Sequence, residues 1–399
     1  MKVISNRGRL MPSSPIRRLV PFADMAKAAG KHVYHLNIGQ PDIRTPDSFL
    51  DPIRNLDMPV VAYGPSAGYT SLRKKLVEYY HRFHIDVDFE DILVTTGGSE
   101  AIIFTMMAIG DEGDEIIIPE PFYTNYNGFA VEAGMKIVPI TSTIENDFKL
   151  PPIESISEKI TPRTRAILIC NPNNPTGYVY SDSELEALRK IVLEHDLFLL
   201  ADEVYREFTY DGTTHTSILQ LSGIDDRSIM LDSVSKRYSA CGARIGMIVS
   251  RNKAVIETAL KFGMARLCPP SIEQVGVESG IDTPAEYFAE VNEEYTQRRN
   301  TMVQLLRQIP GVMAPNPKGA FYLVVRLPVD DANRFAQWLL TDFHVNNETV
   351  MLAPADGFYS TPGLGKDEVR IAYVLNVEDI KKAMHILAEA LNVYPGRIN

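Results

Sequence analysis

The sequence predicts an α/β fold in two parts: a large domain with a mainly parallel seven-stranded sheet sandwiched by helices, and a smaller α+β domain. Between about residues 90 and 250, short apolar runs alternate with amphipathic helical patterns. This alternation is typical of parallel strands whose sheet is covered on both faces. Beyond Pro270 a long charged helical stretch leads into further strand and helix patterns, which indicates the second unit. A chain of 399 residues is also too long for one small core.

Seven apolar runs are the candidate strands of the large sheet, and each is followed by polar or glycine-containing residues. They are residues 92–96, 115–119, 136–140, 166–170, 198–201, 228–232 and 245–249. Helices are expected between them over 99–107, 124–134 and 183–194. In the last of these helices Leu185, Leu188 and Val192 share one face, and Ser183 is the predicted N-cap.

The C-terminal part begins with an expected helix over roughly 284–308, which carries many charged residues. Strands are expected at 320–326 and 368–373, and helices near 331–342 and 377–392. We therefore predict three segments. Residues 1–45 form an N-terminal arm and part of the small domain, 46–285 form the large domain, and 286–399 form the C-terminal small domain.

Composition limits the classes of partner. Hydrophobic residues make up 45% of the chain and charged residues 23%, as in soluble globular proteins. A formal net charge of -11 disfavours nucleic acids and anionic membranes. The sequence has no run of about 18 apolar residues and no signal-peptide pattern at its start, so a cytoplasmic location is expected. The three cysteines form no CxxC pair, which predicts reduced thiols and no metal site.

The segment 233–246 places one lysine, Lys236, among small hydroxyl residues, with Arg244 between two glycines. A nucleophilic amine needs nearby cations or burial to become neutral and form a Schiff base. Ser233, Ser235 and Arg244 together could hold a phosphate beside that amine. An amine next to a phosphate grip suits pyridoxal 5′-phosphate, whose ring acts as an electron sink. The alternative is an exposed lysine in a serine- and glycine-rich loop.

Further polar residues follow the candidate strands, and ligands of open α/β sheets bind at the carboxyl ends of strands. Gly98 and Ser99 open the helix after the first strand, where backbone N–H groups bind phosphate. Glu100 favours the helix dipole, with its side chain pointing away from the phosphate. The alternative is a simple turn. Tyr123 follows the second strand and could stack on a heteroaromatic ring, or belong to an aromatic core.

Three more sites follow apolar runs. The loop 171–177 contains two Asn-Pro steps, and it presents the Asn174 amide to a cleft unless it is only a ligand-free turn. Asp202 could face a pyridinium nitrogen and Tyr205 a ring oxygen, or Asp202 could be a helix N-cap. Arg370 is a lone charge in an apolar strand, so it needs a carboxylate from a ligand or from a structural ion pair.

Together these motifs resemble the class I and II pyridoxal-phosphate aminotransferases of fold type I, the aspartate aminotransferase superfamily. The likeness runs from Asn37-Ile-Gly39-Gln-Pro41-Asp42 to Arg370. Its most specific parts are Asn174-Pro-Thr-Gly and Ser-x-Ser-Lys236 followed by Gly-x-Arg244-x-Gly.

The resemblance implies pyridoxal 5′-phosphate as cofactor and a role for each motif. Lys236 would form the Schiff base and then carry the proton. Asp202 would pair with the ring nitrogen, and Tyr205 and Asn174 would bind the ring's phenolic oxygen. Tyr123 would stack on the ring, where the best-known members carry tryptophan. The phosphate would be held by the backbone of Gly98, Ser99 and Glu100 together with Ser233, Ser235 and Arg244.

The resemblance also implies substrates and assembly. Gly39 and Arg370 would receive the substrate's α-carboxylate, and Asn174 would also line the substrate site. Tyr63 would reach the phosphate of a neighbouring subunit, which implies a homodimer with shared active sites.

The implied reaction is a ping-pong transfer of the amino group of an L-amino acid to a 2-oxo acid. Aspartate and 2-oxoglutarate are the leading pair, while aromatic, alanine and branched-chain substrates stay open. A second cation for a side-chain carboxylate could come from Arg17, Arg18 or Arg266.

The main alternative is a pyridoxal-phosphate carbon–sulfur β-lyase on the same scaffold. A non-catalytic cofactor-sensing regulator is disfavoured, because the motifs begin near Asn37 and leave no room before them for a DNA-binding domain. A nicotinamide dehydrogenase is disfavoured because no GxGxxG motif opens a βαβ unit.

Overall fold

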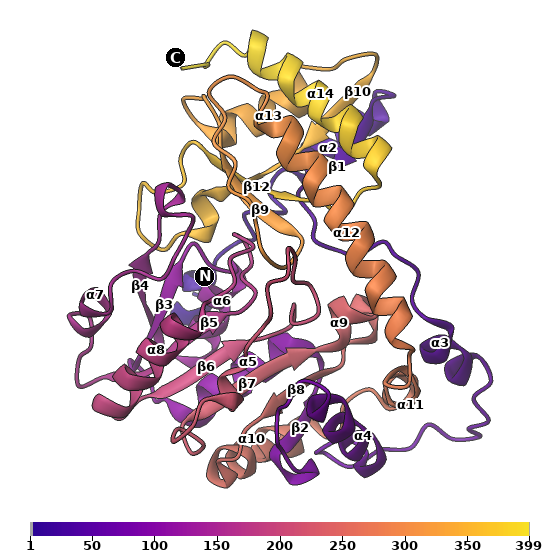
Figure 1. Cartoon of the computed structure of the whole chain (residues 1–399), viewed down its shortest axis with the longest axis vertical. Helices are drawn as coiled ribbons and strands as arrows, with labels where there is room; N and C mark the ends of the chain where they lie inside the picture. Colours follow the sequence, from indigo (N-terminus) through magenta and orange to yellow (C-terminus); the bar gives the residue numbers. More distant parts are fainter. Residues whose placement is uncertain (1–2, 399) are drawn as a thin grey trace.

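The large sheet of the protein contains seven strands, as predicted. The computed structural model describes residues 3–398 (Figure 1). The strand order is β2 (Ile92–Thr95), β8 (Gly246–Val249), β7 (Ser228–Ser233), β6 (Phe198–Asp202), β5 (Thr164–Cys170), β3 (Glu115–Glu120) and β4 (Lys136–Thr141). Strand β8 runs antiparallel to both β2 and β7, and the other pairs are parallel. The mainly parallel sheet predicted from the apolar runs is confirmed.

Helices cover both faces of this sheet. Successive side chains of a strand point to opposite faces, so the apolar residues of one strand pack against helices on both sides. Ile116 and Ile118 of β3 share a core with α5, α6 and α10, whereas Ile117 packs with α8 on the other face. Helix α4 covers that second face over β2, β7 and β8. The helices of this part are α3 (Asp47–Arg54), α4 (Thr70–His81), α5 (Gly97–Ile109), α6 (Asn125–Ala133), α7 (Ile153–Ser157), α8 (Asp182–Glu194), α9 (Val234–Arg237), α10 (Lys253–Arg266) and α11 (Ser271–Gly280).

The C-terminal region forms a second layer above the carboxyl edge of the large sheet (Figure 1). Its antiparallel sheet has the order β11 (Ala353–Pro354), β12 (Glu368–Ala372) and β9 (Tyr322–Arg326). The long helix α12 (Ala285–Leu306) runs from the large sheet into this region, where α13 (Ala332–Thr341) and α14 (Val377–Val393) complete it. Strands β9 and β12 and all three helices were expected close to these bounds, whereas the two-residue strand β11 was not expected.

The N-terminal residues join the C-terminal region. Strand β1 (His32–His35) pairs in parallel with β10 (Glu348–Met351), and α2 (Val20–Ala28) packs on α13. A short helix, α1 (Asn6–Leu10), precedes them and contacts α6. The division of the chain into domains at residues 45 and 285 stays a prediction. None of the helices within residues 3–398 is long and apolar enough to cross a membrane.

The predicted N-cap of α8 is wrong. The helix begins at Asp182, and Ser181 caps it: the Ser181 Oγ accepts from the Glu184 N–H at 3.3 Å. The Glu184 carboxylate in turn accepts from the Ser181 N–H at 2.8 Å. This reciprocal capping box needs serine and glutamate three residues apart. Ser181 and Glu184 have that spacing, and Ser183 also has a glutamate, Glu186, three residues on, so spacing alone did not select the cap.

Candidate active site

The strand ends and the C-terminal region enclose a cavity of about 660 Å³. Twelve of the fourteen predicted site residues line it: Gly39, Gly98, Ser99, Tyr123, Asn174, Asp202, Tyr205, Ser233, Ser235, Lys236, Arg244 and Arg370. The other two, Glu100 and Tyr63, do not. Because parallel strands end at one edge, residues from the ends of β2, β3, β5, β6 and β7 meet here although they are far apart in sequence.

Lys236 extends into this cavity from the short helix α9, which begins directly after β7. Its Nζ donates a hydrogen bond to the Gly39 carbonyl at 2.9 Å and lies 3.8 Å from the Cys241 Sγ. Within residues 3–398, no carboxylate lies within ion-pairing distance of this amine. The amine therefore faces a space where a ligand carbonyl carbon can approach it.

Asp202 ends strand β6 and is buried. Its Oδ2 accepts a hydrogen bond from the Tyr126 hydroxyl at 2.8 Å, and its Oδ1 lies 3.4 Å from the Val204 N–H. Burial raises the pKa of Asp202 to about 6. In the described part of the chain no cationic side chain lies within 4.0 Å of it, so this carboxylate can accept a cation from a ligand.

A corner of the cavity that could receive an anion forms where β2 and β7 flank β8. Because β8 is antiparallel, its amino end lies at the same edge as the carboxyl ends of its neighbours, and Arg244 precedes it there. Gly97 has a φ of +78°, and a Cβ on it would lie 2.4 Å from the Arg244 Nη2, so only glycine fits. The Ser233 and Ser235 hydroxyls lie 2.9 Å apart. Both serines line the cavity together with Arg244.

Glu100 points away from the cavity, as expected. Its Oε2 accepts from the Thr96 N–H at 2.7 Å, and its Oε1 lies 3.6 Å from the Arg266 Nε. The carboxylate therefore caps the first turn of α5, and only the backbone of this residue is available to an anion.

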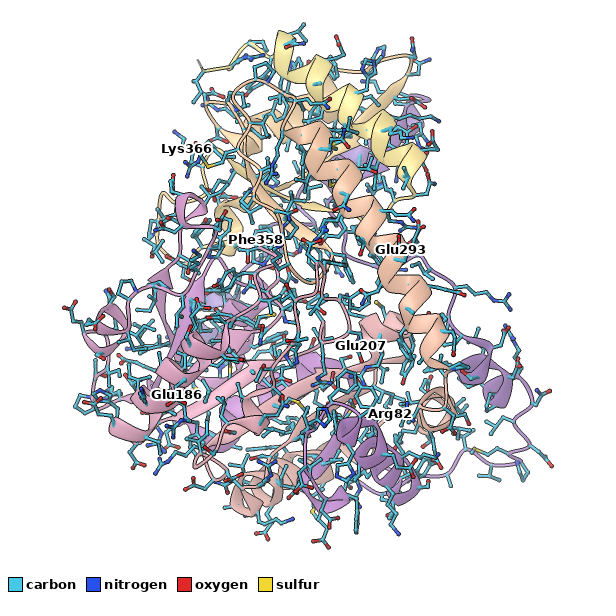
Figure 2. The ribbon with its side chains drawn as sticks, viewed as in Figure 1. Arg82, Glu186, Glu207, Glu293, Phe358 and Lys366 are labelled. Atoms are coloured by element: carbon cyan, nitrogen blue, oxygen red, sulfur yellow. The ribbon has the colours of Figure 1, made fainter. Side chains whose placement is uncertain are left out.

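Arg370 on β12 is 2% exposed and has no acidic partner within 4.0 Å among the described residues. Its Nη1 donates to the Asn174 Oδ1 at 3.1 Å and its Nη2 to the Asn37 carbonyl at 2.5 Å, but its Nε has no partner within residues 3–398. The rings of Tyr322 and Phe358 lie 4.6 and 4.9 Å from the guanidinium carbon. Phe358 lies between the two layers of the molecule (Figure 2). A buried arginine without a counter-ion is costly, so this site calls for a carboxylate ligand.

Tyrosine hydroxyls connect the two layers at the cavity. The Tyr205 and Tyr322 hydroxyls are 3.0 Å apart, and the Tyr322 hydroxyl also donates to the Gly39 carbonyl at 3.2 Å. A Cβ on Gly39 would lie 1.7 Å from the Tyr322 hydroxyl oxygen, which explains the glycine. Burial raises the pKa of Tyr205, so its hydroxyl stays protonated and can donate to a ligand oxygen. Tyr123 lines the wall, and its hydroxyl accepts from the Asn125 amide at 2.8 Å.

Three residues that hold predicted site residues in place were not themselves predicted. Tyr126 holds Asp202, Tyr322 holds Gly39 and stacks on Arg370, and Asn37 gives its carbonyl to Arg370. Tyr126 lies three residues after Tyr123 on the same helical pattern, which is a usable signal. Nothing in the sequence singles out Tyr322, and Asn37 opens the motif that contains Gly39 but gives no sign of its contact with Arg370, because these contacts join segments that are far apart.

The three arginines considered as ligands of a substrate's side-chain carboxylate lie in different surroundings. Arg17 lines the cavity, and its side chain makes no hydrogen bond or ion pair with the described residues. Arg18 pairs with Asp356 at 2.9 Å, and Arg266 faces Glu100 outside the cavity. Tyr63 is 81% exposed on the surface.

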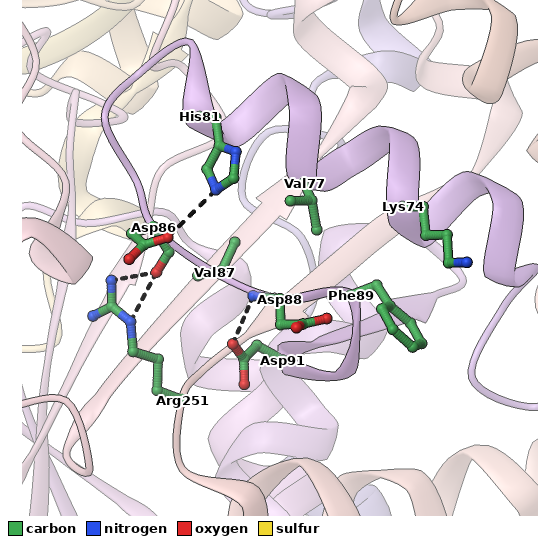
Figure 3. Close-up of a pocket in the computed structure, with 9 residues that line it drawn as sticks. All are labelled: Lys74, Val77, His81, Asp86, Val87, Asp88, Phe89, Asp91 and Arg251. Atoms are coloured by element: carbon green, nitrogen blue, oxygen red, sulfur yellow. Dashed lines mark hydrogen bonds and ion pairs between the residues drawn. The ribbon is translucent and has the colours of Figure 1, made fainter.

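A second hollow of about 620 Å³ lies between α4 and the loop before β2 (Figure 3). Its charged groups are largely engaged: the His81 Nε2 lies 3.4 Å from the Asp86 carboxylate, and the Arg251 Nε donates to the Asp86 carbonyl at 2.9 Å. None of the predicted site residues lines it. The chemistry-bearing side chains are therefore gathered in the first cavity.

The residues of the first cavity fit the phosphorylated pyridine cofactor that the motifs imply. A buried carboxylate without a cation suits a protonated ring nitrogen, and the corner at Gly97 and Arg244 suits a phosphate. A lysine amine lines the same cavity.

Comparisons with known proteins agree on one family. A family profile described as "Aminotransferase class I and II" matches residues 31–387. An aspartate aminotransferase of Bacillus subtilis is 32% identical, covering 96% of this chain and 97% of that protein. An aromatic-amino-acid aminotransferase of Thermococcus litoralis is 30% identical over 97% of this chain and 98% of its own. The structure of Thermus thermophilus aspartate aminotransferase with maleate superimposes with a TM-score of 0.89 and 29% identity, covering 98% of this chain and 100% of the other.

Proposed function

The chain belongs to the class I and II aminotransferase family, and from that premise we propose that it transfers the amino group of aspartate to 2-oxoglutarate at the cavity described above. It is a pyridoxal-phosphate-dependent transaminase by family. The substrate pair, the residue roles and the assembly are our proposals. One observation supports them most. Lys236, Asp202 and Arg370 line one cavity, and in the described part of the chain the buried Asp202 has no cationic partner and the buried Arg370 no acidic one.

The cofactor would be held at both ends. Asp202 would pair with the ring nitrogen and keep it protonated, with Tyr126 orienting the carboxylate. Arg244, the two serine hydroxyls and the N–H groups at the start of α5 would hold the phosphate. Tyr205 and Asn174 would bind the phenolic oxygen, and Tyr123 would stack on the ring. When bound, pyridoxal 5′-phosphate supplies an electron sink for the bonds at the substrate's Cα.

Lys236 would act first as nucleophile and then as general base, and both roles require a neutral amine. Its Nζ would take the proton from the substrate's Cα and return it to the adjacent carbon of the cofactor. The Gly39 carbonyl accepts a hydrogen bond from this amine and thereby orients it toward the cavity.

Arg370 would bind the α-carboxylate. Two of its nitrogens are already held by Asn174 and Asn37, which fixes the plane of the guanidinium group. The third, Nε, is buried and free to donate. A carboxylate arriving here gains a charge-assisted hydrogen bond in a setting that excludes water.

A dicarboxylic substrate is supported by Arg17, a cation on the cavity wall whose side chain has no partner among residues 3–398. Binding of the second carboxylate here would distinguish aspartate and 2-oxoglutarate from alanine. The Thermus thermophilus enzyme, a relative in structure, is recorded with the dicarboxylate maleate.

We also propose a homodimer whose sites are shared. Val60, Val61 and Tyr63 are 71, 61 and 81% exposed. The end of α10 lies beside this segment, because the Arg266 Nη2 donates to the Ser66 carbonyl at 3.2 Å, and it exposes Met264 and Leu267. Such an apolar patch is typical of a protein interface.

A half-reaction screen tests this function. Purified protein loaded with pyridoxal 5′-phosphate is mixed with single amino acids, and the cofactor absorbance is followed as the amino group is transferred. We expect aspartate and glutamate to react, with alanine much slower. Bound cofactor whose spectrum no amino acid changes would contradict the proposal. Release of pyruvate and ammonia from L-cystathionine without an oxo acid would indicate the β-lyase instead.

A further inference from the structure

A group of buried charged side chains lies directly beside the cavity. Its members are Glu203, Arg206, Asp232 and Arg237, whose side chains are at most 1% exposed. We call these four residues the buried ionic cluster. Each is the immediate chain neighbour of a cavity-lining residue, in the pairs Asp202–Glu203, Tyr205–Arg206, Asp232–Ser233 and Lys236–Arg237. None of the four lines the cavity itself, and Asp232 and Ser233, which are neighbours on β7, point to opposite sides of the strand.

Arg206 joins the ends of β6 and β7. Its Nη2 donates to the Glu203 Oε2 at 3.0 Å and its Nη1 to the Asp232 Oδ2 at 3.2 Å. The other oxygen of Glu203 accepts from the Ser217 hydroxyl at 2.9 Å and the Ile218 N–H at 3.0 Å. One rigid guanidinium fork thus links the residue after Asp202 to the residue before Ser233, at the ends of two paired strands.

Asp232 extends this link to the helix that carries the lysine. Its Oδ2 also accepts from the Arg237 Nη2 and from the Tyr80 hydroxyl, the latter at 2.9 Å. Its Oδ1 accepts from the Ser233 N–H at 2.7 Å. The Arg237 Nε lies 3.4 Å from the carboxylate of Glu207, which lies beside α9 (Figure 2). A single carboxylate therefore ties together the end of β7, the first turn of α9 and Arg206.

Stability alone does not explain such a cluster. Removing charges from water costs several kcal/mol per ion, and apolar residues of similar size often replace buried ion pairs without loss of stability. Apolar packing does not fix the direction in which side chains point. Hydrogen bonds between ions are directional, so they hold their partners in one arrangement.

We propose that the buried ionic cluster, with Arg206 at its centre, positions Asp202, Ser233 and Lys236 relative to one another. Arg206 is a positioning residue: it acts through Glu203 and Asp232 and does not line the cavity. The inference rests on the proposed function, since the three positioned groups are the ones that would hold the ring nitrogen, the phosphate and the reacting carbon.

The test compares Arg206→Lys with Arg299→Lys. Lysine keeps the charge but cannot bridge two carboxylates as a fork. Arg299 is an equally buried arginine that pairs with Asp211 at 2.6 Å and does not line the cavity, so its variant controls for general loss of stability. Thermal unfolding of the cofactor-free proteins, the dissociation constant of pyridoxal 5′-phosphate, the pH titration of its bound absorbance and kcat are measured for all three proteins.

For Arg206→Lys we expect cofactor binding to weaken about tenfold and kcat to fall about tenfold to a hundredfold, because the reacting groups are misplaced. The pH at which the bound absorbance changes should move as well. In Arg299→Lys these three quantities should stay within about twofold of the wild type at a comparable loss of melting temperature. Wild-type values in Arg206→Lys, or equal losses in both variants, would overturn the inference.

If Arg206→Lys does not fold, Tyr80→Phe decides the question. This variant removes one hydrogen bond to Asp232 and leaves no charge unpaired. We expect cofactor binding about threefold weaker, and unchanged binding and absorbance would overturn the inference. Failure of the wild type itself to bind the cofactor and transfer amino groups would refute the proposed function, which is a separate outcome.

Discussion

Asp202 serves the site at the expense of stability. Burial raises its pKa from 3.8 to about 6, so the folded protein without cofactor holds the proton more tightly than the unfolded chain. The stability linked to this proton is fully present below about pH 4 and is lost as the pH rises through 6. Two pKa units correspond to about 3 kcal/mol.

The Asp202→Asn variant removes this dependence. Relative to it, the free energy of unfolding of cofactor-free wild type should fall by about 2 kcal/mol between pH 4 and pH 7.5. Chemical denaturation of both proteins at the two pH values measures this difference, in which the other titrating groups cancel. A difference that does not change with pH would mean that Asp202 is paired in the folded protein. The same variant should bind the cofactor more weakly and lose most of its turnover.

Lys236 bears the chemistry itself. Replacing it with alanine should lower kcat by about a thousandfold or more, because nucleophile and general base are lost together. The fold should persist, since the amine's hydrogen bonds are to the Gly39 carbonyl and a thiol and no buried charge loses its partner. Steady-state kinetics and a thermal melt measure the two effects. Substantial turnover in a folded variant would remove this lysine from its role.

Arg17 and Arg18 are adjacent, but only Arg17 lines the cavity. Arg17→Ala should raise the KM for aspartate about tenfold or more, since a hydrogen bond between charged groups is lost. The kinetic constants for alanine should hardly change. Arg18→Ala removes only the exposed pair with Asp356 and serves as the matched control. Equal effects on the KM for aspartate and for alanine would show that Arg17 does not bind the side-chain carboxylate.

Helix α8 gives a matched pair of serines. Ser181→Ala removes the N-cap and should lower the free energy of unfolding by about 1 kcal/mol. Ser183→Ala, two residues further on, should have a much smaller effect, because its hydroxyl bonds only to that of Ser181. Urea denaturation measures both. A larger loss for Ser183→Ala would restore the cap expected from the sequence.

Strands and helices could be predicted where the pattern of their own residues explains why they form. Ile116, Ile117 and Ile118 are apolar because β3 is buried on both faces, and that pattern is visible in the chain. The direction of β8 is not visible, since a short apolar run reads the same in both directions. It nevertheless decides that Arg244 lies at the carboxyl edge of its neighbours.

Only the wall of the cavity that the large sheet forms could be predicted from the sequence. Strand ends give a rule for where ligands bind, and it placed Asp202 and Lys236 together. The opposite wall depends on how the C-terminal region folds back. Tyr322 reaches Gly39, and Asn37 reaches Arg370, across 283 and 333 residues of sequence. Contacts of that separation leave no local pattern.

The last prediction concerns the assembly of two chains. Tyr63 is exposed in one chain and would complete the site of a second chain, whereas Lys236 serves the site of its own. A dimer mixed from Lys236→Ala and Tyr63→Ala chains therefore has one site with both changes and one site with neither. Random exchange makes about half of the dimers mixed, so intact sites in the mixture should contribute about one quarter of wild-type activity, above the mean of the two variants assayed alone.

This complementation separates a shared site from simple association. Each variant is first assayed alone, then both are mixed under conditions that allow subunit exchange, and activity is followed until it is constant. Mixing Lys236→Ala with Arg370→Ala is the control: both residues line one chain's own cavity, so every site in the mixed dimer carries a change and no activity should return. Recovery in the control but not with Tyr63→Ala would assign the exposed tyrosine no part in the neighbour's site. A chain that stays monomeric at working concentration would exclude the shared site altogether.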